Sequence, residues 1–172
     1  RGQGQLRAAA DCYRRAVQLQ PDYALAHNNL GNVLNDLRIT DDALACYRRA
    51  LALNPALAAA HYNLGAHYQQ TGDFAGAESC WREALQHDPQ HVRALSGLAT
   101  VLGAALPDSD VAALGHLAAL PEVTAGDRAS LLFALAHVSD AQGDHAIAAR
   151  YANAANAWRQ DERQAQGQAY DP

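Results

Sequence analysis

One segment of the chain recurs nearly in register 34 residues further on, and this repeat is the strongest constraint on the fold. Residues 24–55 share twelve identities with residues 58–89. The matching pairs are Ala24/Ala58, Ala26/Ala60, His27/His61, Asn29/Asn63, Leu30/Leu64, Gly31/Gly65, Ala43/Ala77, Cys46/Cys80, Arg48/Arg82, Ala50/Ala84, Leu51/Leu85 and Pro55/Pro89. A fixed period of this size predicts a solenoid, whose units bury their apolar faces only by stacking on one another.

The residue types inside the repeat indicate which kind of solenoid to expect. Each copy has Leu-Gly, then Ala-x-x-x-aromatic, then Ala and Pro: Leu30-Gly31, Ala43, Tyr47, Ala50 and Pro55, followed by Leu64-Gly65, Ala77, Trp81, Ala84 and Pro89. This pattern resembles the tetratricopeptide repeat (TPR) family. The resemblance implies an all-α fold: a right-handed α-solenoid of antiparallel helix pairs, with about four repeats after an amino-terminal half repeat. Gly and Ala suit the close approach of two helices, and Pro ends the second helix.

The repeat pattern divides the chain into six segments. We expect a half repeat (second helix only) over 1–23, TPR repeats over 24–57 and 58–91, a degenerate repeat over 92–124, a TPR-like repeat with a capping helix over 125–160, and a polar tail or linker over 161–172. The third repeat has Val111 and Gly115 in place of the Ala-x-x-x-aromatic pair. Thr124 to Asp127 resembles a capping box that opens the fourth unit.

Three local features refine this division. Arg38 stands in the turn where the next repeat has Gly72. The half repeat at the start lacks its first helix, which predicts an exposed apolar flank. The last helix is expected to run from about His145 to Arg159, because the residues that follow are polar and Gln-rich.

Composition excludes several classes of partner. The net charge of −5 and the lack of a basic cluster argue against nucleic acid. No apolar run approaches the roughly 20 residues that a membrane span needs. With no signal peptide either, we expect a cytoplasmic protein, although the chain opens partway through a repeat. All 13 basic residues are Arg, which we interpret as the bias of a GC-rich genome.

Cysteine and histidine do not form a recognisable metal or catalytic motif. Cys12, Cys46 and Cys80 recur at the repeat spacing and are interpreted as small packing residues. His27 and His61 occupy a large-residue packing position, and the other histidines are scattered. No phosphate loop or nucleophile motif is present. We therefore expect no cofactor, no metal site and no catalytic activity in this chain, which could still be a non-catalytic part of an enzyme.

The family resemblance implies a peptide-binding groove lined by the first helix of each repeat. Carried onto this chain, the groove positions predict a peptide-binding site formed by Asn28, Asn29, Asn32, Asn35, Tyr62, Asn63, Gln69, Gln70, Arg93 and Ser96. Most of these are amides, which both donate and accept hydrogen bonds and can hold an extended peptide by its backbone. The alternative is that they stabilise the helix pairs or face water. The predicted function is a protein interaction module with a protein or peptide partner.

Further resemblances give two alternative functions. Asn29 and Asn63 are similar to the asparagine ladder of O-linked N-acetylglucosamine transferases. Residues 106–172 resemble the segment that joins TPR repeats to a sulfotransferase domain in bacterial proteins. The chain would then be the substrate-recognition arm of a larger transferase, and of bacterial origin. The second alternative is a self-association scaffold, a homo-oligomer formed through the exposed half repeat.

Overall fold

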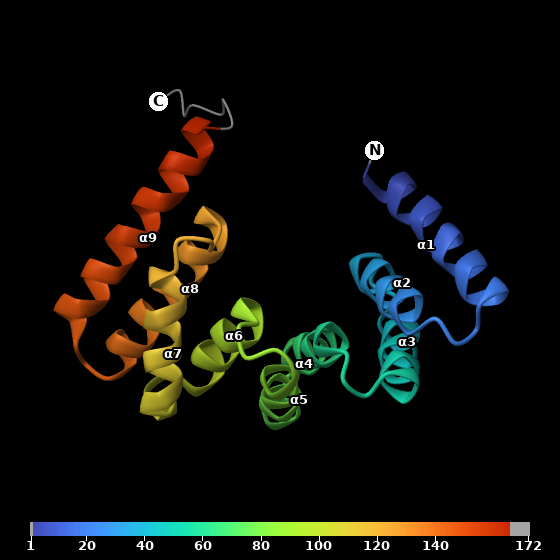
Figure 1. Cartoon of the computed structure of the whole chain (residues 1–172), viewed down its shortest axis with the longest axis horizontal. Helices are drawn as coiled ribbons and strands as arrows, with labels where there is room; N and C mark the ends of the chain where they lie inside the picture. The colour runs from blue at the N-terminus through green and yellow to red at the C-terminus, as the bar shows by residue number, and fades with distance from the viewer. Residues whose placement is uncertain (1, 166–172) are drawn as a thin grey trace. The chain divides into compact units, whose positions relative to one another are not determined.

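The computed structural model describes residues 2–165, and the regular structure of these residues is entirely helical. The chain forms two compact units, residues 1–89 and 90–172, which are described separately. The first contains α1 (Gly2–Leu19), α2 (Ala24–Asp36), α3 (Thr40–Leu53), α4 (Ala58–Thr71) and α5 (Phe74–His87). The second contains α6 (Val92–Leu102), η1 (Gly103–Ala105), α7 (Asp108–Ala119), α8 (Ala125–Ala141) and α9 (His145–Ala165) (Figure 1). No helix in the described part is both long and apolar enough to cross a membrane.

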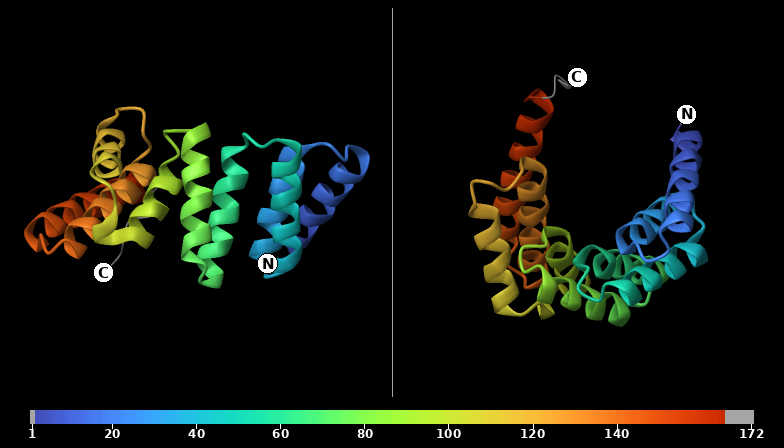
Figure 2. Two further views of the ribbon diagram at one scale, coloured as in Figure 1. Left: turned by 90° about the horizontal axis from the view of Figure 1, so that it is seen from below. Right: turned by 45° about the vertical axis from the view of Figure 1, so that its right-hand side comes forward.

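Two antiparallel helix pairs, α2/α3 and α4/α5, make up most of the first unit, as the repeat pattern predicted (Figure 2). Each pair closes where an aromatic ring lies against a glycine. A Cβ on Gly31 would lie 2.6 Å from Cε1 of Tyr47, and a Cβ on Gly65 would lie 2.6 Å from Cδ1 of Trp81. Any larger residue at these positions would overlap the ring, so glycine is required by the packing.

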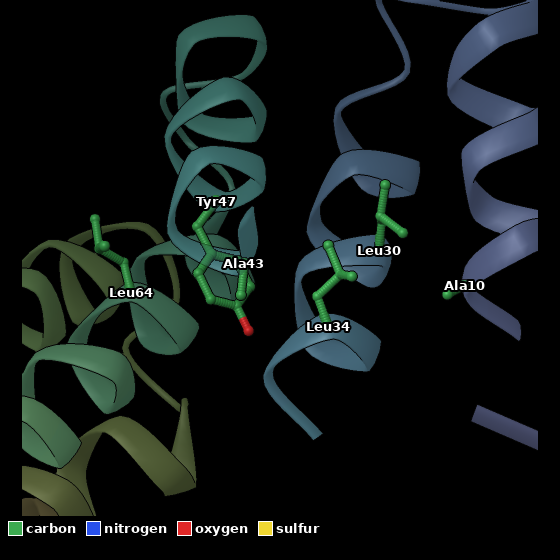
Figure 3. Close-up of a cluster of buried hydrophobic side chains, with 6 residues drawn as sticks. All are labelled: Ala10, Leu30, Leu34, Ala43, Tyr47 and Leu64. Carbon is green, nitrogen blue, oxygen red and sulfur yellow. The ribbon is translucent and has the colours of Figure 1, made fainter. Parts of the chain in front are cut away.

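The core of the first unit runs through four of its helices. Figure 3 shows Ala10 of α1, Leu30 and Leu34 of α2, Ala43 and Tyr47 of α3, and Leu64 of α4 in one buried cluster. Because residues from successive repeats share the cluster, no repeat holds its own core. Each repeat therefore depends on its neighbour for apolar burial, as expected of a solenoid.

The two turns inside the helix pairs have the same backbone despite their different residues. Arg38 has φ +63° and Gly72 has φ +84°. The Arg38 amide donates to Asn35 O at 2.9 Å, and the Gly72 amide donates to Gln69 O at 3.1 Å. The left-handed conformation is strained for a residue with a Cβ and free of strain for glycine. Arg38 therefore stores conformational strain at a position where the next repeat has none.

Replacing Arg38 by Gly is expected to raise the free energy of unfolding by about 0.5–1 kcal/mol. Chemical unfolding followed by circular dichroism measures the change. Gly72→Ala is the matched opposite: nothing lies within 4 Å of the added Cβ, so the expected loss of about 1 kcal/mol is conformational alone. A loss of stability in Arg38→Gly would contradict this explanation.

The degenerate third repeat does not close as a helix pair. Gly115 of α7 stands where the regular repeats have their aromatic residue, and it is exposed, with no heavy atom within 4 Å of an added Cβ. Without this aromatic contact, α7 packs more extensively against α8 than against its own partner α6. The missing Ala-x-x-x-aromatic pair thus explains the departure from the regular repeat.

Arg128 of α8 fixes the end of α7. Its guanidinium donates to the carbonyl oxygens of Ala118, at 2.9 Å, and Leu120. These carbonyls have no partner within α7 because the helix ends there. The same guanidinium lies 4.4 Å from the ring centroid of Trp158 on α9, a cation–π contact. One arginine therefore links three consecutive helices of the second unit.

The fourth unit begins and ends differently from a simple repeat. Thr124 Oγ1 accepts from the Asp127 amide at 3.1 Å, which confirms the helix start expected from the capping-box pattern. Helix α9 continues to Ala165, beyond the expected end near Arg159. Residues 161–165, which the sequence analysis placed in a polar tail or linker, are therefore helical. Residues 166–172 of that predicted tail lie outside the described residues.

The outer side of α1 is less apolar than predicted. Ala10 is buried, and Tyr13 and Val17 pack against the core cluster. Within the described residues of α1, the large hydrophobic side chain that remains exposed is Leu19, at 77%. The exposed apolar flank is therefore smaller than expected, because Tyr13 and Val17 pack against the first unit while Leu19 remains exposed.

The cysteines divide into two environments. Cys46 and Cys80 are half-buried, pack against the core cluster and are free thiols, which confirms their packing role. Burial raises the pKa of the Cys46 thiol and raises that of Cys80 to about 11. Both therefore stay protonated and unreactive near neutral pH. Cys12 is exposed, so the packing interpretation does not extend to it.

Candidate functional site

Three of the predicted amides form a hydrogen-bonded relay between α2 and α4. Asn63 Nδ2 donates to Asn28 Oδ1 at 2.8 Å, and Asn28 Nδ2 donates to Asn29 Oδ1 at 3.4 Å. Asn28 is 3% exposed, whereas Asn29 and Asn63 are half-buried. Asn28 can therefore reach a ligand only through its neighbours, and it orients both of their amide groups. We call Asn28, Asn29 and Asn63 the amide relay.

The relay leaves complementary groups at its two ends. Each amide has one carbonyl oxygen and two N–H donors. Among the described residues, no partner donates to Asn63 Oδ1 and none accepts from Asn29 Nδ2. The pair thus offers an acceptor from one helix and a donor from the next. A peptide group presents the matching N–H and C=O.

Asn32 lies one helical turn from the relay and is held by a tyrosine. Tyr47 Oη donates to Asn32 Oδ1 at 3.0 Å. Burial, reinforced by the charge of Asp36, raises the pKa of Tyr47 to about 12, so the phenol keeps its proton at ordinary pH. The bond fixes the Asn32 amide with its nitrogen as the remaining donor. The ring that closes the first repeat therefore also orients a predicted site residue.

The other predicted residues of the first unit occupy varied environments. Asn35 Oδ1 is buried, and within the described part of the chain it has no hydrogen-bond partner. Gln70 is exposed and Gln69 is half-buried at the end of α4. The backbone carbonyl of Tyr62 accepts from Trp81 Nε1 at 3.2 Å, so this position helps to close the second repeat.

Arg93 and Ser96 lie on α6 in the second unit. Arg93 is exposed. Ser96 Oγ is buried and, in the part that the structure describes, has no hydrogen-bond partner. Among the described residues, hydrogen bonds between predicted site residues thus connect the three members of the amide relay, whereas Asn32 is held by Tyr47.

His27 and His61 have a structural role that the sequence did not reveal. His61 Nε2 lies 2.8 Å from Pro55 O, and His27 Nε2 lies 3.0 Å from Pro21 O. Each ring therefore ties the first helix of its repeat to the preceding turn, rather than only filling space. The recurrence of His and Pro at the repeat spacing was the available signal.

Comparison with protein families identifies the repeats. A TPR-repeat model matches residues 1–37 and 40–72, and a tetratricopeptide-repeat model matches 58–91. Together the matches cover more than half of the chain. The chain belongs to the tetratricopeptide repeat family. All but the last two matched residues lie in the first unit, which also carries the amide relay.

Solved structures support the all-α helical-repeat fold. The chain is similar to MamA, with 17% identity and a TM-score of 0.71 over 95% of this chain and 94% of that one. It is also similar to YrrB, described as a TPR protein with an unusual peptide-binding site, with 23% identity and a TM-score of 0.62 over 87% and 84%.

The third similar structure is a transferase. The O-GlcNAc transferase of Thermobaculum terrenum, as the K341M mutant, is 28% identical with a TM-score of 0.58. The match covers 67% of this TPR chain and only 23% of the transferase. No curated protein is similar enough to this sequence to count as a match.

Proposed function

We propose that this TPR chain binds an extended peptide of a protein partner on the α2/α4 surface of its first unit. Interaction with protein partners is the general role of TPR modules, and the finer proposal concerns the ligand and the residues. Asn29 and Asn63 would hold the peptide backbone, with Asn32, Gln69 and Gln70 extending the polar surface along the same two helices.

The observation that carries the proposal is the orientation of the amide relay. Because Asn28 accepts from Asn63 and donates to Asn29, neither of these half-buried amides is free to rotate without breaking a bond. Preorganised donors and acceptors lose less entropy on binding than mobile ones. An acceptor and a donor on adjacent helices match the alternating N–H and C=O of an extended chain. Recognition of this kind tolerates varied ligand side chains.

The test begins by identifying a ligand through pull-down and peptide sequencing, followed by titration calorimetry with that peptide. Replacing Asn29 and Asn63 together by Ala is expected to weaken binding by about 5- to 150-fold, because two hydrogen bonds of roughly 0.5–1.5 kcal/mol each are lost. The far-ultraviolet circular dichroism should remain nearly unchanged.

The matched control removes two amides from other helices. Gln18 and Gln86 are exposed on α1 and α5, and the double variant Gln18→Ala, Gln86→Ala should bind like the wild type. Equal affinity in the Asn29→Ala, Asn63→Ala variant and the wild type would reject the proposal.

A second candidate function is the substrate-recognition arm of a larger transferase. It is favoured by the 28% identity to the O-GlcNAc transferase over 67% of this chain. In this case the same surface would present a substrate protein to a catalytic domain of the glycosyltransferase or sulfotransferase type. Reading the gene beyond codon 172 is the test: a catalytic domain in frame supports this function, and a stop codon contradicts it.

A further inference from the structure

We propose that His61 of α4, together with Glu83 and His87 of α5, forms a binding site for a divalent transition-metal ion of the Zn²⁺ type. One ligand atom from each of these residues lies within 4.8 Å of the other two. The rings of His61 and His87 are stacked, with centroids 5.7 Å apart. Three side chains with metal-binding atoms thus converge on the second repeat.

The fold brings these residues together in two steps. Glu83 and His87 are four residues apart on one helix, a spacing that places both side chains on the same face. His61 lies on α4, which pairs with α5 through the Gly65 and Trp81 contact. The backbone positions of all three residues are therefore fixed by the core.

The hydrogen bond of His61 prepares its ring for a metal. Pro55 O can only accept, so the 2.8 Å contact requires that His61 Nε2 carries the proton. In the neutral ring, Nδ1 then holds the free lone pair. Metal-binding histidines usually donate their other N–H to a carbonyl or carboxylate in this way, which fixes the tautomer and ring orientation.

The ligand set selects the type of ion. Two imidazoles and one carboxylate suit Zn²⁺ with three protein ligands and one open position, whereas Ca²⁺ and Mg²⁺ prefer oxygen ligands alone. Bonds of roughly 2.0–2.2 Å in a tetrahedron place ligand atoms about 3.4 Å apart. The separations in the structure, within 4.8 Å, exceed this value by about 1.4 Å or less, so binding requires only a small movement of the side chains. The ion would then join α4 to α5.

The preceding repeat supplies a natural control. His27 makes the same bond to its proline carbonyl, at 3.0 Å. The positions of Glu83 and His87 are occupied there by Arg49 and Leu53, which provide no ligand. The site also differs from the peptide surface, because His61 and Asn63 are two residues apart and so point about 200° apart around the helix. Zinc binding therefore does not depend on the proposed peptide binding.

Titration calorimetry of the full chain with zinc chloride tests the site. The wild type should bind one tight ion. The variants His87→Ala and Glu83→Gln should each bind it at least about tenfold more weakly. Loss of a residue that only hydrogen-bonds to a metal ligand already lowers metal affinity by about tenfold or more, and these residues would be ligands themselves. His27→Ala should bind zinc like the wild type. Absence of a tight ion, or equal affinity in His87→Ala and the wild type, would overturn the proposal.

Two further measurements separate this site from binding elsewhere. The absorption spectrum of the Co²⁺ form should lack a thiolate charge-transfer band, and the presence of that band would assign the metal to cysteine instead. Transplanting the ligands beside His27 through Arg49→Glu and Leu53→His should raise the stoichiometry from one ion to two. Failure to gain the second ion would contradict the claim that these three residues on this helix pair suffice.

Discussion

Replacing Trp81 by Ala is expected to lower the free energy of unfolding by about 3–5 kcal/mol, because a fully packed indole is lost and a cavity remains. Trp81 is 1% exposed, fills the space beside Gly65 and donates from Nε1 to Tyr62 O at 3.2 Å. It is the aromatic residue that closes the second repeat. Urea unfolding followed by circular dichroism measures the loss.

The control for Trp81 lies on the same helix. Phe74 is 55% exposed at the start of α5, so Phe74→Ala should change the free energy of unfolding by only about 0.5 kcal/mol or less. Similar losses in Trp81→Ala and Phe74→Ala would mean that the ring does not hold the helix pair together.

The variant Gly65→Leu approaches the same contact from the other helix and should cost about 1–3 kcal/mol or more through overpacking. An added Cβ would lie 2.6 Å from both Cδ1 and Nε1 of Trp81 and 3.1 Å from the backbone oxygen of Ala77. The ring and the backbone would both have to move. A thermal melt compares the variant with the wild type.

The same substitution at Gly115 should change stability in the opposite direction. Gly115 is exposed in α7, with nothing within 4 Å of an added Cβ, so better helix propensity should raise stability by up to about 0.8 kcal/mol. Combining Gly65→Leu with Trp81→Ala should recover part of the Gly65→Leu loss, because the clashing ring is gone. An unaltered melt for Gly65→Leu would show that the close approach is misassigned.

The regular repeats could be predicted because their key residues act locally. Gly31 and Tyr47 are parts of one 34-residue unit, and the same arrangement recurs at Gly65 and Trp81. The packing of the third repeat could not be predicted in this way. The missing aromatic residue indicates which helix contact is absent, but it does not indicate which contact replaces it. Arg128 of α8 binds carbonyl oxygens at the end of α7 and lies over the ring of Trp158 on α9, contacts between separate helices that no repeat spacing predicts.

The sequence predicted which residues form the candidate site, but not which of them contact one another. The repeat positions identified Asn28, Asn29 and Asn63, yet only the packing of α2 beside α4 determines that Asn28 is buried and bonded to both neighbours. The convergence of His61 with Glu83 and His87 was missed for a similar reason. Antiparallel pairing brings them together across a sequence separation that suggests no metal motif.

The central claim is that the amide relay contacts the backbone of a bound peptide. Nuclear magnetic resonance of the side-chain NH₂ groups during a titration with the captured peptide tests it most directly. The signals of Asn29 and Asn63 should shift together and saturate at the affinity measured by calorimetry, while those of Gln18 and Gln86 stay in place. If the protein is saturated with peptide and the Asn29 and Asn63 signals have not shifted, the account is contradicted.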